Sequence, residues 1–284
     1  SEDVYNVLVS PDHKKLVYRV GRGNLMLADI EDGALSNSKA YSSGWAEAED
    51  VSWSPDSKYI AYSQEDLDFD SEIFIQSVVN PNDKFNVSMH PRSDRSPVWS
   101  PDGKKLAFSS NRSGNRGGID YDVWMVWLKK EDWERSKTDR DNGDYYLEKE
   151  ADNDKKEMEL EVTIDKEKIF DRLTRITRLP DDEYGGMFGP DSKYVYYSAT
   201  DPSTNIRSFF KVKLDGTSPK AIKGTSKVGR VAAIDGKFYF TSGGKLKELN
   251  PEGDKITSLA HVAKYKEDFT AINQQIYQEG TRVL

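Results

Sequence analysis

A short phrase of polar and apolar positions recurs along the chain and divides it into units. The phrase is Ser-Pro-Asp-x-Lys, followed by a run in which apolar residues return at every second position. Copies begin at Ser10, Ser54 and Ser100, a copy with glycine in place of serine begins at Gly189, and a shorter one covers 234–237. Their aspartates stand at 12, 56, 102, 191 and 235, so the steps between them are 44, 46, 89 and 44 residues. A unit of about 40–45 residues fits every step if the third unit carries an insertion.

The phrase predicts a β-turn between two strands. Proline presets the first central position of a turn, and Asp, Ser or Gly tolerate the conformations that follow. Apolar residues alternate on both sides, as at Val51 and Trp53 before one turn and at Leu106 and Phe108 after the next. A further strand-like run follows in each unit, at 24–28, 72–75, 122–126 and 208–212. Residues 1–263 are therefore predicted to be all-β, a β-propeller or partial propeller of about five four-stranded blades, with the strand aromatics packed between blades.

Two segments depart from the repeat. Residues 129–159 hold 12 acidic and 8 basic side chains among 31, with few apolar ones, so they cannot bury enough surface to offset their ordering entropy. We expect this charged insertion to be a mobile loop in blade three, and residues 160–178 to supply the outer strand of that blade. Near the end of the chain, apolar residues return at helical spacing, which predicts a C-terminal linker helix over 264–284, leading to a further domain.

The composition excludes several classes of protein. A formal net charge of −8, from 41 Lys and Arg against 49 Asp and Glu, argues against sequence-independent nucleic-acid binding. The lack of cysteine excludes thiol catalysis and thiolate zinc sites, and only His13, His90 and His261 are available as imidazole bases or ligands. No apolar run approaches the roughly 20 residues of a membrane helix. The two Ser-x-x-Lys strings, 208–211 and 242–245, lie in predicted strands, where that spacing sends the side chains to opposite faces.

The blade phrase and its following apolar strand resemble the propeller repeats of TolB and of tricorn-type proteases. The run from Phe108 to Asn115, followed by 122–126, is typical of that repeat. Residues 162–165 (Val-Thr-Ile-Asp) and 169–175 (Ile-Phe-Asp-Arg-Leu-Thr-Arg) are similar to the strand that follows a charged insertion in bacterial tricorn-like proteases. The predicted terminal helix is similar to the segment that joins propeller and protease in that family. Five blades are fewer than the six or seven of the family, so the propeller is expected to be incomplete or open.

The resemblance implies a large serine peptidase whose propeller docks and filters peptides ahead of PDZ-like and protease domains. No catalytic residue of that family falls within this chain, so the chain alone is expected to lack peptidase activity, and no cofactor is implied. The expected function is a non-catalytic propeller region that binds or gates peptide substrates and positions the protease domains. A stand-alone TolB-like module that binds a protein partner in the periplasm is the alternative. The propeller of a prolyl-oligopeptidase-type enzyme is the third.

Location and assembly follow from the same resemblance and from the blade edges. Bacterial relatives of the suspected family are commonly exported, which favours the periplasm or cell envelope, with the cytoplasm as the alternative. An incomplete propeller exposes strand edges, which favours pairing between copies and therefore a homo-oligomer.

Four arginines in two loops near blade three are candidates for binding a partner. Arg92, Arg95, Arg112 and Arg116 could form a cationic rim that receives a peptide carboxylate, because a guanidinium matches carboxylate geometry. Propeller loops carry function more often than strands do. Arg112 also belongs to the repeat phrase, where a structural role in the turn is the alternative.

Two tryptophans and an acidic cluster complete the candidate residues. Trp45 and Trp133 lie in predicted loops, unlike the strand tryptophans, and are candidates for contact with a ligand. Asp66, Asp68 and Asp70 have the every-second spacing that could supply oxygen ligands to calcium. The cluster lacks the glycine and the final glutamate of an EF-hand loop, so a solvated hairpin in blade two is the alternative.

Overall fold

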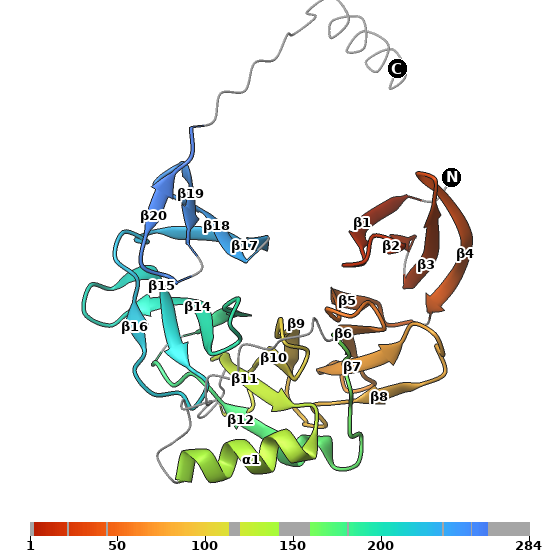
Figure 1. Cartoon of the computed structure of the whole chain (residues 1–284), viewed down its shortest axis with the longest axis horizontal. Helices are drawn as coiled ribbons and strands as arrows, with labels where there is room; N and C mark the ends of the chain where they lie inside the picture. Colours follow the sequence, from red (N-terminus) through yellow and green to blue (C-terminus); the bar gives the residue numbers. More distant parts are fainter. Residues whose placement is uncertain are drawn as a thin grey trace, which may run out of the picture.

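In the computed structural model, the chain forms five four-stranded antiparallel sheets arranged as propeller blades (Figure 1). The structure describes residues 3–21, 23–43, 45–113, 120–141, 160–180, 182–234, 236–250 and 252–260. Within each blade the strands pair in chain order. Their bounds in blades 1 and 2 are β1 (Val4–Val9), β2 (Lys15–Val20), β3 (Asn24–Glu31), β4 (Ala34–Ser42), β5 (Ala48–Trp53), β6 (Tyr59–Glu65), β7 (Ser71–Ser77) and β8 (Lys84–Asn86).

The other three blades follow the same plan. Their strands are β9 (Asp94–Trp99), β10 (Lys105–Ser110), β11 (Asp122–Trp127) and β12 (Leu173–Arg175) in blade 3, β13 (Tyr184–Phe188), β14 (Tyr194–Asp201), β15 (Ile206–Lys213) and β16 (Lys220–Ala221) in blade 4, and β17 (Val228–Ile234), β18 (Lys237–Ser242), β19 (Lys245–Leu249) and β20 (Ile256–Ser258) in blade 5. The charged insertion lies between β11 and β12. The predicted all-β fold of five four-stranded blades is confirmed.

The repeated phrase folds as the predicted turn because its polar side chains bind the turn backbone. In blade 1 the buried Ser10 hydroxyl donates to Asp12 Oδ1 (2.6 Å), and the main-chain N–H of Lys14 donates to the same oxygen (3.1 Å). The next residue, His13, has φ of 58°, and its equivalents in the other blades have φ between 57° and 71°. The serine–aspartate bond recurs at 2.6 Å in blade 2 and at 2.5 Å in blade 3. The phrase is therefore a self-capped turn with one left-handed residue.

Each blade also carries a β-bulge in its innermost strand. The pairing between the first and second strands shifts register once per blade, within residues 5–8, 49–52, 95–98, 184–187 and 228–231. In four blades the residue six positions before the turn aspartate has a positive φ: Asn6, Asp50, Ser96 and Gly185. A bulge of this kind increases the local twist of the strand that carries it.

Apolar side chains fill the four joints between successive blades. The joints are built around Val17, Leu25, Ile60 and Tyr62 (blades 1 and 2), Ile73, Ile75, Leu106 and Phe108 (2 and 3), Val123, Met125, Val195 and Tyr197 (3 and 4), and Tyr196, Phe209, Phe238 and Phe240 (4 and 5). At two joints a tryptophan adds a hydrogen bond across the blades. Trp53 Nε1 donates to the carbonyl of Leu8 (3.2 Å), and Trp99 Nε1 donates to that of Ser52 (3.1 Å).

The blades form an open arc, with blades 1 and 5 at its two ends (Figure 1). No core cluster of the described residues joins these two blades. All six residues of β1 are exposed, including Val4 (58 %) and Val7 (54 %). Of the two forms that the repeat predicts, the described residues adopt the partial propeller.

The charged insertion starts as a helix, where the sequence predicts a loop. Helix α1 (Lys130–Asp141) follows β11, and the return segment 160–172 ends in a short 3₁₀ turn (Ile169–Arg172) before β12. The prediction fails for α1 because the helix has no apolar stripe. It is held instead by Trp133, which packs against the joint between blades 3 and 4. Residues 142–159 and the predicted helix 264–284 lie outside the described residues.

Among the described residues, no helix is both long enough and apolar enough to span a membrane.

Candidate functional site

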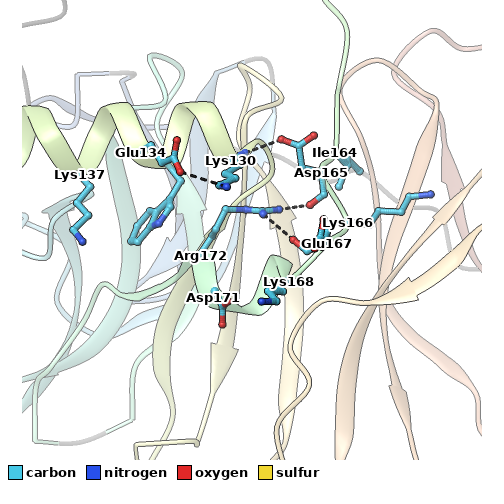
Figure 2. A pocket seen from close by; sticks show the side chains of 11 residues that line it. Lys130, Glu134, Lys137, Ile164, Asp165, Lys166, Glu167, Lys168, Asp171 and Arg172 are labelled. Atoms are coloured by element: carbon cyan, nitrogen blue, oxygen red, sulfur yellow. Dashed lines mark hydrogen bonds and ion pairs between the residues drawn. The ribbon is translucent and has the colours of Figure 1, made fainter.

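The base of the insertion is closed by Arg172, which is almost completely buried (Figure 2). Its guanidinium donates hydrogen bonds to four main-chain carbonyls. Two belong to the last residue of β11, Trp127 (2.9 Å), and to the residue after it, Leu128 (3.1 Å). The other two belong to the return segment, Asp165 and Glu167 (3.2 Å). Because a guanidinium carries five donors in a planar fork, this one side chain fastens both ends of the insertion together.

The neighbouring residues of segment 162–175, which carries the resemblance noted above, belong to the same clamp. Asp165 Oδ2 accepts the main-chain N–H of Lys130 (2.8 Å) at the start of α1, and the Asp165 N–H donates to the carbonyl of Leu128 (2.9 Å). Ile169 is part of the apolar joint between blades 2 and 3, and Ile164 packs against that joint. The motif that carries the resemblance therefore has a structural task, which is to fix the insertion to two blades.

The return segment crosses the joint between blades 2 and 3 beside Gly103, which has no side chain to obstruct it. Val162 is buried there, and its N–H donates to Asp56 Oδ2 (2.8 Å). A Cβ on Gly103 would lie 2.9 Å from Val162 Cγ2. The residue equivalent to Gly103 in blade 2 is Ser57, whose hydroxyl accepts the N–H of Asp12 across the blades (3.1 Å). In blade 3 this inter-blade bond is replaced by the packing of Val162.

A pocket of about 800 Å³ lies between α1 and the return segment (Figure 2). One wall is formed by Lys130, Trp133, Glu134 and Lys137 of α1, and the other by residues 164–168, with Asp171 and Arg172. Charges of both signs alternate around it, and Lys130 pairs with Glu134 at 3.7 Å. Trp133, one of the two tryptophans predicted to contact a ligand, is half-buried in this wall. The lining suits a polar segment of a protein or peptide rather than an apolar small molecule.

A second candidate site lies on the loops at one end of blade 2. Trp45, in the linker between β4 and β5, meets Phe69 edge-on, with ring centroids 6.0 Å apart and an interplanar angle of 75°. Trp45 is 61 % exposed, and on the β6–β7 hairpin Phe69 is 73 % and Leu67 is 83 % exposed. These three side chains are called the blade-2 loop patch below. It contains Trp45, the other tryptophan predicted to contact a ligand.

The aspartates with calcium-like spacing form the hairpin that carries this patch. The N–H of Asp66 donates to the carbonyl of Asp70 (2.9 Å), and Asp66 Oδ1 accepts the N–H of Asp68 (2.9 Å). Asp70 Oδ1 accepts the hydroxyl of Ser93 from the next linker (3.3 Å). No group of three or more His, Asp or Glu side chains suited to a metal ion occurs among the described residues. The geometry is that of the solvated hairpin.

Among the described residues, Arg112 does not join the predicted arginine rim. Arg112 is turned inward, where it donates to Asp94 Oδ2 (2.8 Å) and lies over the ring of Trp124 at 5.0 Å. Its contacts are those of the structural role that was the alternative. Arg92 and Arg95 are exposed and make no ion pair with any described residue. Arg116 lies outside the described residues.

Two buried carboxylate pairs at successive blade joints are not predicted from the sequence. At the joint of blades 2 and 3, the fully buried Asp94 is bonded to Arg112 and faces Glu72. Burial raises the pKa of Asp94 to about 6, against the opposing effect of the Arg112 charge. Burial also raises the pKa of Glu72, whose carboxylate accepts the Ser88 hydroxyl (2.5 Å).

The joint of blades 3 and 4 repeats this arrangement. Glu183 is fully buried, faces Asp122, and accepts the N–H of Leu179, while Asp122 is paired with Arg175 at 2.8 Å. Burial raises the pKa of Glu183 to about 8, and the Asp122 carboxyl acts in the same direction. Asp94 and Glu183 both stand eight residues before a turn aspartate, and this shared offset is the one sequence signal that could have pointed to them.

The first Ser-x-x-Lys string forms no catalytic pair. The Ser208 hydroxyl donates to the carbonyl of Ile206 (3.3 Å), whereas Lys211 Nζ donates to the carbonyl of Glu252 in blade 5 (2.7 Å). In the second string, the Ser242 hydroxyl donates to the carbonyl of Ser226 (2.7 Å). Each serine is therefore engaged with the backbone. The first string lies along β15 as predicted, but the second does not follow one strand: Ser242 ends β18 and Lys245 begins β19, where the two residues pair across the hairpin.

Comparison with known proteins places this fold among solved propellers. No protein-family model and no curated protein matches the sequence. The structure is similar to the tricorn protease (TM-score 0.65, 14 % identity, 91 % of this chain and 26 % of that chain) and to a protein assigned as TolB from Agrobacterium tumefaciens (0.59, 17 %, 90 % and 80 %). It is also similar to an oligogalacturonate lyase from Vibrio parahaemolyticus (0.61, 10 %, 93 % and 68 %). The likeness is one of fold. Because proteins of such different activities share it, function must be argued from the surface.

Proposed function

We propose that this chain is a non-catalytic propeller module that binds a protein or peptide partner. The observation that carries the proposal is the blade-2 loop patch, in which Trp45, Leu67 and Phe69 are each more than half exposed. Folded domains bury most large apolar side chains, and an exposed aromatic cluster on loops is typical of a contact surface. The packed blades beneath the patch provide a rigid support for it.

In its finer form, the proposal places the module in a tricorn-like serine peptidase. There it would bind or gate peptide substrates and position the protease and PDZ-like domains. The likeness to the tricorn protease supports this form. The segment that carries the sequence resemblance, 162–175, is present as a folded clamp at the base of the insertion, which is compatible with it. This chain spans about a quarter of the tricorn protease, so the peptidase itself is part of the proposal. The periplasm or cell envelope is the compartment proposed for this form, with the cytoplasm as the alternative.

A stand-alone TolB-like module that binds a protein in the periplasm is the second candidate. It is favoured by the extent of the likeness, because the chain spans 80 % of the TolB-type protein from Agrobacterium tumefaciens. The two candidates differ in the size of the native polypeptide. An immunoblot of the source organism with antibody to this chain should show a band several times larger than 32.3 kDa for the peptidase. A band at 32.3 kDa supports the module instead.

Peptide binding itself can be tested without knowing the partner. A phage-displayed library of random linear peptides is selected on the immobilised chain, and in parallel on the same chain unfolded in urea. The proposal predicts families of related sequences that are enriched on the folded chain alone. Enrichment that is equal on both surfaces, or absent from both, would contradict it.

A further inference from the structure

The β6–β7 hairpin of blade 2 holds its apolar side chains away from the core. The hairpin is closed by two main-chain hydrogen bonds, from Asp66 N–H to the Asp70 carbonyl (2.9 Å) and from Phe69 N–H to the Asp66 carbonyl (3.2 Å). Phe69 has φ of 62°, a left-handed conformation that bulky residues seldom adopt. Asn or Gly would adopt this conformation with less strain. The contacts of the phenylalanine ring should therefore account for its presence here.

The ring of Phe69 contacts a second loop rather than the blade interior. Its partner is Trp45, which comes from the linker between blades 1 and 2. Edge-to-face aromatic pairs are favourable, and this one fixes the two loops relative to each other while leaving both rings largely open to solvent. The patch is therefore a preformed apolar surface, which lowers the entropy lost when a partner binds.

The charges on the hairpin that carries Leu67 and Phe69 are negative and form no ion pair among the described residues. The hairpin alternates acidic and apolar residues, and Glu65, Asp66 and Asp68 form no ion pair with any described residue. Asp70, at the base, is bound by the Ser93 hydroxyl and faces His90. Arg92 and Arg95 follow in the same linker, and neither is paired with the hairpin among the described residues. Carboxylates at this density repel nucleic-acid phosphates and anionic lipid, and attract lysine and arginine side chains.

We propose that the blade-2 loop patch, with Asp66 and Asp68, binds an extended peptide segment in which an apolar side chain stands beside lysine or arginine. The apolar side chain packs on Trp45 and Phe69, and the cation lies against the two aspartates. This inference rests on the proposed peptide-binding function and assigns to it a surface and a partner chemistry. It also differs from the predicted arginine rim, which would select a carboxylate.

The test uses three short fluorescein-labelled peptides and fluorescence anisotropy with the full chain. In one peptide lysine and leucine alternate, in the second glutamate replaces lysine, and in the third serine replaces leucine. The lysine–leucine peptide should bind at least about tenfold more tightly than either of the others. The lysine–serine peptide measures attraction to the net negative charge of the chain alone.

Variants then locate the binding surface. Phe69→Asn suits the left-handed backbone, and Trp45→Ala removes an exposed ring, so both variants should fold. Each substitution should lower the affinity for the lysine–leucine peptide about tenfold. The double variant Asp66→Asn, Asp68→Asn should also bind this peptide less tightly, and its affinity should depend less on salt concentration. The matched control is Val79→Ser, which removes a still more exposed apolar side chain (85 %) from the β7–β8 connection, at the opposite end of blade 2. This variant should bind the peptide as the unmodified chain does.

Two results would overturn the inference. One is equal or tighter binding of the glutamate–leucine peptide, and the other is unchanged binding by Phe69→Asn and Trp45→Ala. In either case, peptide families that library selection enriches on the folded chain would keep the proposed function standing and move the binding surface elsewhere. Failure of that selection as well would reject both.

Discussion

The buried carboxyl of Glu183 should make the stability of the propeller depend on pH. Its pKa is raised by burial, and also by the Asp122 carboxyl, to about 8, from 4.5 for an exposed glutamate. Between these two values the folded chain keeps a proton on Glu183 that the unfolded chain has lost. The stability that this group contributes is therefore complete below pH 4.5 and is lost as the pH rises to about 8.

The magnitude is large enough to measure. One pKa unit corresponds to about 1.4 kcal/mol, so the whole interval corresponds to roughly 5 kcal/mol, against a typical domain stability of about 5–15 kcal/mol. Between pH 6 and 8 the free energy of unfolding should fall by about 2–3 kcal/mol. The groups that face this carboxyl are Asp122, with its partner Arg175, and Tyr197, whose pKa burial raises far above this range. Burial lowers the pKa of His90 from 6.5. Below pH 6.5 this histidine therefore makes the free energy of unfolding rise with pH, opposite to the effect of Glu183.

Glu183→Gln isolates the effect because the glutamine oxygen can still accept the Leu179 N–H. Urea unfolding, followed by tryptophan fluorescence at a series of pH values, should show a nearly flat free energy between pH 6 and 8 for this variant. Asp94→Asn is the matched control from the neighbouring joint. The pKa of Asp94 is raised only to about 6. In this variant the free energy of unfolding should therefore still fall with pH above pH 6, and it should depend less on pH below pH 6 than in the unmodified chain. The reasoning is refuted if Glu183→Gln retains the slope of the unmodified chain between pH 6 and 8.

Three further substitutions test the clamp, the crossing and the open edge. Arg172→Met leaves four carbonyls without their donor and should lower the free energy of unfolding by about 3 kcal/mol or more. Trypsin should then cleave α1 early. Calorimetry that shows no change in Tm would contradict the clamp. Gly103→Ser forces a side chain against Val162 and should cost about 1–3 kcal/mol in urea unfolding, whereas equal stability would mean that the crossing has room to spare. The exposed face of β1 should make the chain self-associate with increasing concentration in light scattering, and Val7→Lys should reduce this; a monomer at every concentration would oppose the idea.

The fold is predictable from the sequence because its turns are coded locally. In Ser-Pro-Asp-x-Lys the serine and aspartate bind backbone groups of their own turn, as Ser10 and Asp12 show, so the signal does not depend on the rest of the chain. Alternating apolar residues then give the strands and their buried faces. Helix α1 escapes prediction because its stability comes from tertiary contacts, those of Trp133 and the Asp165 cap, rather than from an apolar stripe of its own.

The candidate site is less predictable because it depends on which loops meet. The sequence predicts Trp45 as an aromatic residue in a loop. Its contact with Phe69, however, joins two loops more than twenty residues apart in the sequence. Arg112 looks exposed in the sequence, and only the fold shows that it turns onto Asp94, which lies at the start of the neighbouring strand of the same blade. The carboxylate pair of Asp122 and Glu183 likewise comes from two separate segments. Such pairings depend on which loops and strands meet in the folded chain, and the local turn and strand patterns do not specify that.

The central claim is that this chain binds a peptide without cleaving it. The most direct measurement is a fluorescence titration of the purified chain with a peptide enriched by library selection, followed by mass spectrometry of the same samples after prolonged incubation. We expect saturable binding and recovery of the peptide intact. A titration without saturation, or a peptide cut in a reaction that serine-protease inhibitors block, would contradict the account.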